Sequence, residues 1–200
     1  DIDDAIMSSV VPSVTNTVKE AVRKLFGVDV MMAGPGVKTG LNILIDNPAQ
    51  LGSDQAVDAV AAINQYPVPL IIIDMGTATT LSVVDSKKNY RGGLILTGMK
   101  VAADALTART AQLPKVNFEV PPHVIGTNTI DCLKSGILYS NASALDGIID
   151  RIEDELGEKC TAVATGGLSE LVVPLCRRKI ILDNNLLIKG LAIIYRKNKK

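Results

Sequence analysis

The chain has 200 residues, and its 21 Lys and Arg balance 21 Asp and Glu, so the formal net charge is zero. A chain without net positive charge offers no overall field for nucleic acid or for an anionic membrane surface. Hydrophobic residues make up 47% of the chain, and 16 Gly with 9 Pro is ordinary usage, which excludes disordered, collagen-like and low-complexity classes. We therefore expect a folded domain that binds neither nucleic acid nor membrane.

The cysteine and histidine content narrows the chemistry further. Three widely spaced Cys without a CxxC pair indicate neither a disulfide framework nor a zinc site, which favours a cytoplasmic location. The longest apolar run, about Val68 to Ile73, is far shorter than the roughly 20 residues that span a bilayer. Because the chain has a single His, we expect carboxylates to carry any acid–base chemistry.

Hydrophobic periodicity, turn residues and prolines predict alternating helices and strands, and therefore an α/β fold. A boundary is expected near residue 67, where a β-rich unit restarts and leaves a first part too small to cover its own helices. The predicted elements are a helix over 13–27, a strand over 28–33, an extended stretch to 45, a helix over 53–66, a strand over 69–75, a hairpin over 79–96, helices over 99–113 and 129–156, a strand over 161–165, a helix over 168–176, a strand over 179–183 and a helix over 186–196.

The segment DMGTATT, residues 74–80, lies where a buried strand turns into a hairpin. Gly76 has no Cβ, so backbone N–H groups there can approach phosphate oxygens, and Thr77 adds a hydroxyl donor. Asp74 can hold a cation beside the phosphates. The alternative is an ordinary glycine turn capped by threonine. Phosphate loops of the actin, Hsp70 and sugar-kinase superfamily resemble this arrangement.

A second glycine motif, ATGGLSEL, follows a predicted strand and opens a helix. Gly166 and Gly167 would let a flat ligand lie against the backbone, although paired glycines also occur merely for close packing. In the superfamily named above, this position holds adenosine.

The segment LGSDQAVDAV places Asp54 at the start of a predicted helix. A carboxylate there can act as the general base for an alcohol, or simply interact with the helix dipole. The residues themselves leave both possibilities open.

Several blocks in fixed order resemble the type III pantothenate kinase family over essentially the whole chain. They are SSVVP, PGVKTGLNI, DNPAQLGSD, DMGTATT, YRGGLIL, IGTNT, SGI, ATGGL and LLIKGLAIIY. The resemblance implies ATP-dependent phosphorylation of pantothenate to 4′-phosphopantothenate, in coenzyme A biosynthesis, with Mg²⁺ and a monovalent cation (K⁺ or NH₄⁺). It also implies a homodimer of chains with two ribonuclease-H-like domains, of which residues 1–67 would be the remainder of the first and residues 68–200 the second.

The same resemblance implies a role for individual residues. Asp54 would accept the proton, Asp74 would bind the monovalent cation, and Thr129 would contact pantothenate. The remaining substrate contacts would be Gly52, Ser53, Gln55 and Ile45, and the ATP contacts would be Gly76, Thr77, Gly166 and Gly167.

The chain also departs from the family pattern. The opening DxGNT phosphate loop is not found, and the chain opens on Asp1, from which we expect a preceding piece. Gln55 replaces an arginine, and Ile45 stands where a tyrosine is expected. Losing a guanidinium removes a bidentate donor for a carboxylate substrate. Two hypotheses follow, a pantothenate kinase and a non-catalytic paralogue that binds nucleotide or a pantothenate-like ligand in a regulatory role.

Overall fold

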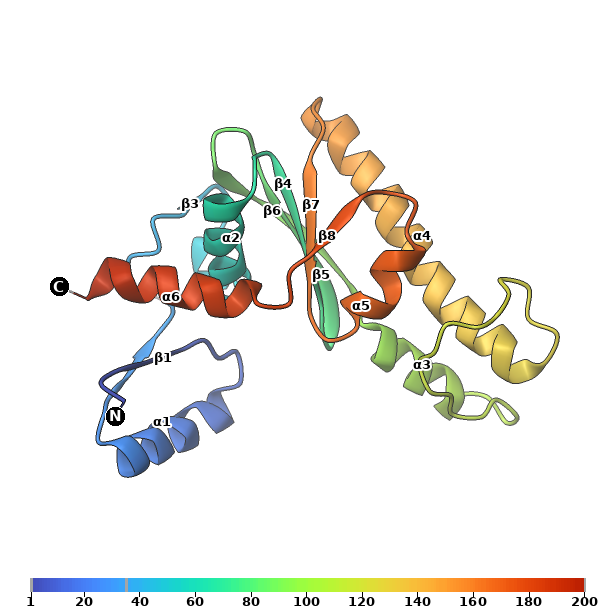
Figure 1. Ribbon diagram of the computed structural model, residues 1–200, viewed down its shortest axis with the longest axis horizontal. Coiled ribbons are helices and arrows are strands. Elements are labelled where there is room, and N and C mark those ends of the chain that lie inside the picture. The colour runs from blue at the N-terminus through green and yellow to red at the C-terminus, as the bar shows by residue number, and fades with distance from the viewer. Residues whose placement is uncertain (1, 35, 200) are drawn as a thin grey trace.

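The computed structural model describes residues 2–34 and 36–199, and a six-stranded mixed sheet forms its centre (Figure 1). Its strands run in the order β3-β6-β5-β4-β7-β8. β4, β5 and β6 pair antiparallel, whereas β7 and β8 continue parallel from the other side of β4. This is the strand arrangement expected of a ribonuclease-H-like domain. The strands are β3 (Asn42–Ile43), β4 (Leu70–Met75), β5 (Ala78–Val84), β6 (Asn89–Thr97), β7 (Thr161–Thr165) and β8 (Ile180–Leu182).

Helices cover both faces of this sheet. Ile71, Ile73 and Met75 of β4 face a core formed with α4 (Thr129–Leu156) and α5 (Ser169–Val172). Leu70 and Ile72 alternate to the opposite face, where α2 (Ser53–Gln65) and the start of α6 (Leu186–Asn198) lie. The period of two along the strand therefore separates two cores.

Small residues let α2 approach both the sheet and α6. Ala59, Ala61 and Ala62 are fully buried against the sheet. On α6, a Cβ at Gly190 would collide with the carbonyl oxygen of Val57, so glycine permits close contact of the two helices. These contacts fix α2 over the sheet.

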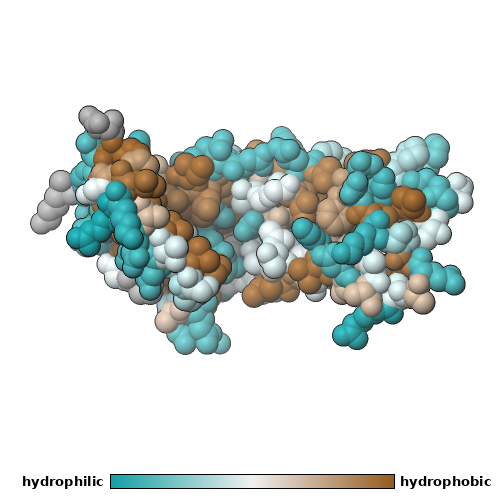
Figure 2. All heavy atoms as spheres, turned by 90° about the horizontal axis from the view of Figure 1, so that it is seen from below, coloured by the Kyte–Doolittle hydropathy of each residue, from teal (hydrophilic) through white to brown (hydrophobic). Residues whose placement is uncertain are grey.

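The N-terminal segment forms a small unit beside α6. β1 (Ala5–Met7), which sequence patterning missed, pairs in parallel with β2 (Val30–Met32). α1 (Pro12–Phe26) is amphipathic but has no buried residue, and Val14 and Leu25 are exposed. Figure 2 shows apolar surface gathered at this end of the molecule.

Two predicted helices differ from those observed. α3 (Met99–Ala108) ends five residues before the expected Leu113. The segment is largely exposed, and Thr110 donates its hydroxyl to the Leu106 carbonyl, so little packing sustains another turn. The helix expected over 168–176 is α5 followed by a 3₁₀ turn, η2 (Val173–Leu175), because Pro174 lacks the donor that a continuous helix needs.

The linker at residue 67 joins α2 to β4, and α2 packs on the sheet that follows it. The division into residues 1–67 and 68–200 stays a prediction. A short 3₁₀ turn, η1 (Pro48–Gln50), precedes α2. Among the described helices, none combines the length and apolar character needed to cross a membrane.

Candidate active site

A cleft of about 530 Å³ opens where the N-terminus of α2 meets the carboxyl ends of β4 and β7. Such a position, beyond the carboxyl ends of parallel strands, is where open α/β sheets usually bind ligands. The cleft is lined by Asp54, Asp58, Asp74, Thr165, Gly166, Gly167, Glu170, Asn184 and Leu187. Sequence reasoning singled out four of these residues, Asp54, Asp74 and the two glycines.

Strand alternation directs Asp74 to the α2 side of the sheet, the side of Leu70 and Ile72. In the sheet register Asp74 pairs with Thr165 of β7 and Thr80 of β5. The apolar strand therefore ends in a half-buried carboxylate beside a buried threonine.

The first turn of α2 brings Asp54 to the cleft. Gly52 is the N-cap, and the hydroxyls of Ser53 and Ser8 hydrogen-bond at 2.8 Å. Oδ1 of Asp54 accepts the backbone N–H of Gln55 at 2.8 Å. The segment SSVVP thus helps to anchor the helix that carries the predicted base.

The turn after β7 closes tightly over Asp74. Gly166 has φ +93°, a conformation that L side chains rarely adopt. A Cβ on Gly166 would lie 2.6 Å from Oδ1 of Asp74 and 2.7 Å from the Met75 backbone. Ser169 holds the turn by donating its N–H and its hydroxyl to the Gly166 carbonyl, at 3.1 and 2.7 Å. By contrast, Gly167 has open space where a Cβ would be.

Asp58 is a cleft residue that sequence reasoning missed. It lies one turn beyond Asp54, is 3% exposed, and its Oδ1 has no hydrogen-bond partner among the described residues. Burial, reinforced by the carboxylates of Asp74, Asp54 and Asp183, raises the pKa of Asp58 to about 8. An Asp four residues after Asp54, in a run of Ala and Val, was the sequence pattern that could have revealed it.

The cleft is strongly acidic. Its described lining contains Asp54, Asp58, Asp74 and Glu170 but no Lys or Arg. Burial, and next the charge of Asp54, raises the pKa of Asp74 above its usual value. Such a site favours a cation, which would lower the repulsion between carboxylates and incoming phosphates.

The residues of the cleft suit a cation that is bound jointly by protein and phosphate better than a cation that is enclosed by protein ligands alone. Within the described chain, no three His, Cys, Asp or Glu side chains are grouped to hold a metal ion by themselves. Mg²⁺ commonly binds through one or two carboxylates, with phosphate oxygens and water as its other ligands. The half-buried Asp74 at the strand end, near Gly166, can offer a carboxylate oxygen to a cation, whether monovalent or divalent, that takes its other ligands from phosphate and water.

The turn between β4 and β5 carries two other predicted ATP contacts. Gly76 and Thr77 are exposed, and the N–H of Gly76 donates to the Ala78 carbonyl at 3.0 Å. A Cβ on Gly98 would meet the Thr77 carbonyl, so these segments lie close together. Neither Gly76 nor Thr77 lines the cleft itself.

Five of the predicted substrate contacts also lie outside the lining, namely Gly52, Ser53, Gln55, Ile45 and Thr129. Gln55 is half-buried beside Asp54, and Ile45 packs against the core under α2. Thr129 is exposed and begins α4, whose yellow start lies at the end of the molecule away from α2 (Figure 1).

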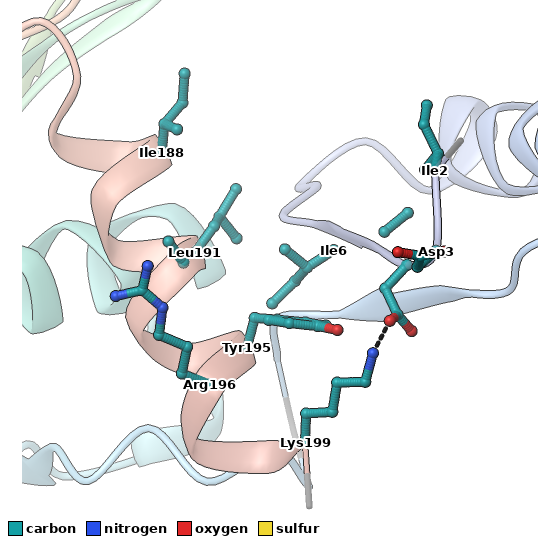
Figure 3. A pocket seen from close by; sticks show the side chains of 11 residues that line it. Ile2, Asp3, Ile6, Ile188, Leu191, Tyr195, Arg196 and Lys199 are labelled. Atoms are coloured by element: carbon teal, nitrogen blue, oxygen red, sulfur yellow. Dashed lines mark ion pairs between the residues drawn. The ribbon is translucent and has the colours of Figure 1, made fainter.

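A larger cavity of about 750 Å³ lies between the N-terminal segment and α6. Figure 3 shows Ile188, Leu191 and Tyr195 of α6 opposite Ile6 of β1, with Lys199 paired to Asp4 at the rim. Its lining includes no glycine turn and none of the predicted residues. We therefore take the smaller acidic cleft as the candidate active site.

Comparison with known sequences decides the family. A sequence model described as type III pantothenate kinase matches residues 1–151. The chain belongs to the type III pantothenate kinase family. It is 42% identical to the type III pantothenate kinase of Halalkalibacterium halodurans over 198 residues, which cover 99% of this chain and 78% of that protein. The type III pantothenate kinase of Exiguobacterium sp. AT1b is also 42% identical, over 100% of this chain and 78% of the relative.

Solved structures support the fold of this family member. A Baf family transcriptional activator from Campylobacter jejuni matches with a TM-score of 0.58 and 20% identity, over 99% of this chain and 84% of that one. The activator of 2-hydroxyisocaproyl-CoA dehydratase from Clostridium difficile matches with a TM-score of 0.50 and 16% identity, over 96% and 85% of the two chains. The expected α/β fold is confirmed, and the order and directions of its strands are those of a ribonuclease-H-like sheet.

Proposed function

We propose that the acidic cleft is where this pantothenate kinase transfers phosphate from ATP to pantothenate. The primary hydroxyl of pantothenate attacks the γ-phosphorus, which gives 4′-phosphopantothenate and ADP. The observation that carries this proposal is the meeting of Asp54, Asp74 and Gly166, from three separate elements, in one cleft. Phosphoryl transfer depends mainly on positioning and charge neutralisation, which such a cleft supplies.

Asp54 is the proposed base. It would accept the proton of the primary hydroxyl as the new O–P bond forms. Its Oδ1 accepts the Gln55 N–H, which restricts the carboxylate and leaves the other oxygen to receive the proton. The resemblance supports the same assignment.

The glycine turn and the end of β4 form the proposed nucleotide side. Gly166 and Gly167 would lie against the adenosine, and the exposed turn at Gly76 and Thr77 would contact ATP. Asp74 would hold the monovalent cation. Mg²⁺, when bound with ATP, would neutralise charge on the phosphate oxygens.

The proposed pantothenate side is the start of α2. Gly52, Ser53 and Gln55 surround Asp54 there, and Ile45 lies under the helix. Thr129 starts α4 away from this cleft, so it would reach pantothenate from a second copy of the chain. That arrangement agrees with the homodimer that the resemblance implies, and the cysteine content favours a cytoplasmic location.

The test is a direct assay of the full-length gene product. With ATP, Mg²⁺ and pantothenate, mass spectrometry should detect 4′-phosphopantothenate, and turnover should rise when K⁺ or NH₄⁺ replaces Na⁺. Nucleotide binding without any product, in all three salts, would contradict the proposal and favour the regulatory paralogue.

That second candidate rests on the two departures in the substrate region. Gln55 lacks the guanidinium of the family pattern, and Ile45 lacks its phenol. If the protein binds nucleotide but does not turn over, Gln55→Arg combined with Ile45→Tyr is the informative rescue.

A further inference from the structure

A cavity of about 500 Å³ lies between α4 and the strands β5 and β6. Its volume is within the range of about 300–1,000 Å³ that is usual for small-molecule sites. Val83 of β5 lines this cavity and pairs with Ile71 at the start of β4, whereas Asp74 of the acidic cleft lies near the end of β4. The two sites are therefore at opposite ends of the sheet, and the proposed reaction gives this cavity no role.

The glycines of the segment YRGGLIL create the space. Gly92 has φ +119°, and a Cβ on Gly93 would collide with the Leu81 carbonyl oxygen, so the backbones of β5 and β6 require glycine there. No side chain from either glycine fills the gap below α4. Arg91 is the extra residue of a β-bulge opposite Val83, and bulges commonly redirect a side chain.

The lining is apolar in its depth and charged at its surface. Val83 and Ile152 are each 8% exposed, whereas Arg91, Arg151 and Glu155 are exposed. Two guanidinium groups and one carboxylate give the lining a single net positive charge. An apolar pocket with a few polar groups at its edge is typical of a ligand site.

The two arginines differ in how far they are already paired. Nη1 of Arg91 lies 3.5 Å from Oδ2 of Asp85. Nη1 of Arg151 donates to the Gly147 carbonyl of its own helix at 2.8 Å, and Arg151 has no ion pair within the described part of the chain. Arg151 is therefore the cation that is free to pair with an anion entering the cavity.

We propose that this cavity binds a small monocarboxylate with an apolar body. The apolar body would pack against Val83 and Ile152, and the carboxylate would pair with the guanidinium of Arg151. One net positive charge matches a monoanion, whereas a phosphate monoester brings a charge of about −1.5 to −2 close to Glu155. Binding at this cavity is independent of the proposed kinase reaction, because the acidic cleft takes no part in it.

The experiment titrates the full-length protein, with ¹³C-labelled isoleucine methyl groups, with sodium octanoate at pH 7. The methyl resonances of Ile148 and Ile152, which line the cavity, should shift and saturate. Those of Ile188, in the larger cavity beside α6, and of the exposed Ile125 should stay in place. Similar shifts at all four residues would mean adsorption to any apolar surface and would overturn the proposal, as would an absence of shifts at Ile148 and Ile152.

The carboxylate is tested with 1-octanol and octyl phosphate, which carry the same chain, and both should bind more weakly than octanoate. Arg151→Gln should raise the Kd for octanoate about 10-fold, because it removes a charge-assisted pair. Arg109→Gln, which removes an exposed guanidinium at the end of α3, is the control and should leave this Kd as it is. An unchanged Kd in Arg151→Gln, or binding of either other probe as tightly as octanoate, would overturn the proposal.

Discussion

Asp54 combines two properties, a place at the N-terminus of α2 and a place in the lining of the acidic cleft. A base and a helix-dipole partner respond differently to amide substitution. If Asp54 accepts the substrate proton, Asp54→Asn should lower kcat by about 10² to 10⁴. The melting temperature should change little, because asparagine is also well tolerated at helix starts. Steady-state kinetics and thermal unfolding on the same preparations test this.

The control for this substitution is Asp104→Asn, an exposed carboxylate on α3, which should leave kcat as it is. If Asp54→Asn instead kept full turnover per folded molecule and only lowered the melting temperature, Asp54 would serve as a partner of the helix dipole and not as the base.

The two adjacent glycines after β7, Gly166 and Gly167, allow a substitution and its matched control to be compared at neighbouring positions. Gly166→Ala places a methyl group against Asp74 and Met75 and forces alanine to φ +93°, so we expect a loss of about 1–3 kcal/mol of stability. It should also weaken nucleotide binding, because the methyl group moves the carboxylate of Asp74. Gly167→Ala meets nothing within 4 Å and should fold normally. Denaturant unfolding and ADP titration of both variants measure these effects. If the two variants lost the same stability and the same affinity for ADP, the turn would have no specific need for glycine at residue 166.

At the scale of elements, α2 is held at both ends and along its length. Ser8 bonds Ser53 at its start, and the hydroxyl of Tyr66 donates to Asp183 at its end, at 2.8 Å. Burial, and then the bond to Asp183, raises the pKa of Tyr66 to about 12, so it stays a donor at physiological pH. Burial opposes the ionisation of Asp183, but the bonds from Lys189 and Tyr66 outweigh it and lower its pKa.

The contact between α2 and α6 yields a second prediction. Gly190→Ala would press a methyl group onto the Val57 carbonyl, so the helices must separate, at a cost of about 1–3 kcal/mol. Since Asp54 lies on α2, the displacement should also lower kcat. Urea unfolding with parallel kinetics measures both effects.

Gly136→Ala is the matched control for Gly190→Ala. Gly136 also lies inside a helix, α4, but nothing within 4 Å opposes a methyl group there. Alanine should therefore stabilise the protein by about 0.5–1 kcal/mol. Equal destabilisation by both substitutions would argue against a specific contact at Gly190.

Most elements were predictable from sequence because their patterns are local. The helix Thr129–Leu156 lies between the N-cap residue Asn128 and the C-cap residue Gly157, and it has the predicted bounds. β1 was missed because three residues carry no periodicity, and its pairing with β2 depends on contacts distant in sequence. α3 was predicted too long because Pro114 sets only an outer limit, and the helix ends earlier, where the chain is exposed and little packing supports another turn.

The candidate site was predictable only in part. Glycine turns and strand-end carboxylates are local motifs, so Asp54, Asp74 and Gly166 could be named in advance. Glu170 reaches the cleft from α5 and Asn184 from the turn before α6, and their mutual hydrogen bond depends on how β8 pairs with β7. No spacing in the sequence encodes that meeting.

The whole molecule places the two sides of the proposed reaction on different regions of its surface. The cleft lies at α2, whereas the predicted pantothenate contact Thr129 is the first residue of α4, and the yellow start of that helix lies at the other end of the molecule (Figure 1). One chain therefore cannot bring both to one substrate in the described arrangement, but a two-fold dimer could. Apolar side chains near Thr129 are exposed, among them Ile125 at 83% and Ile130 at 49%.

A dimer formed through the region of Ile125 predicts linked effects on assembly and substrate binding. Light scattering at micromolar concentration should give twice the mass of one chain, and Ile125→Asp should shift the protein towards monomer, because an interface does not readily bury an unpaired carboxylate. The same variant should raise the KM for pantothenate more than that for ATP, since only pantothenate would lose the partner's contribution.

Leu25→Asp on α1, at the opposite end and 74% exposed, is the control and should leave both the mass and this KM ratio as they are. A parent that stays monomeric while phosphorylating pantothenate would show that Thr129 takes no part in the reaction.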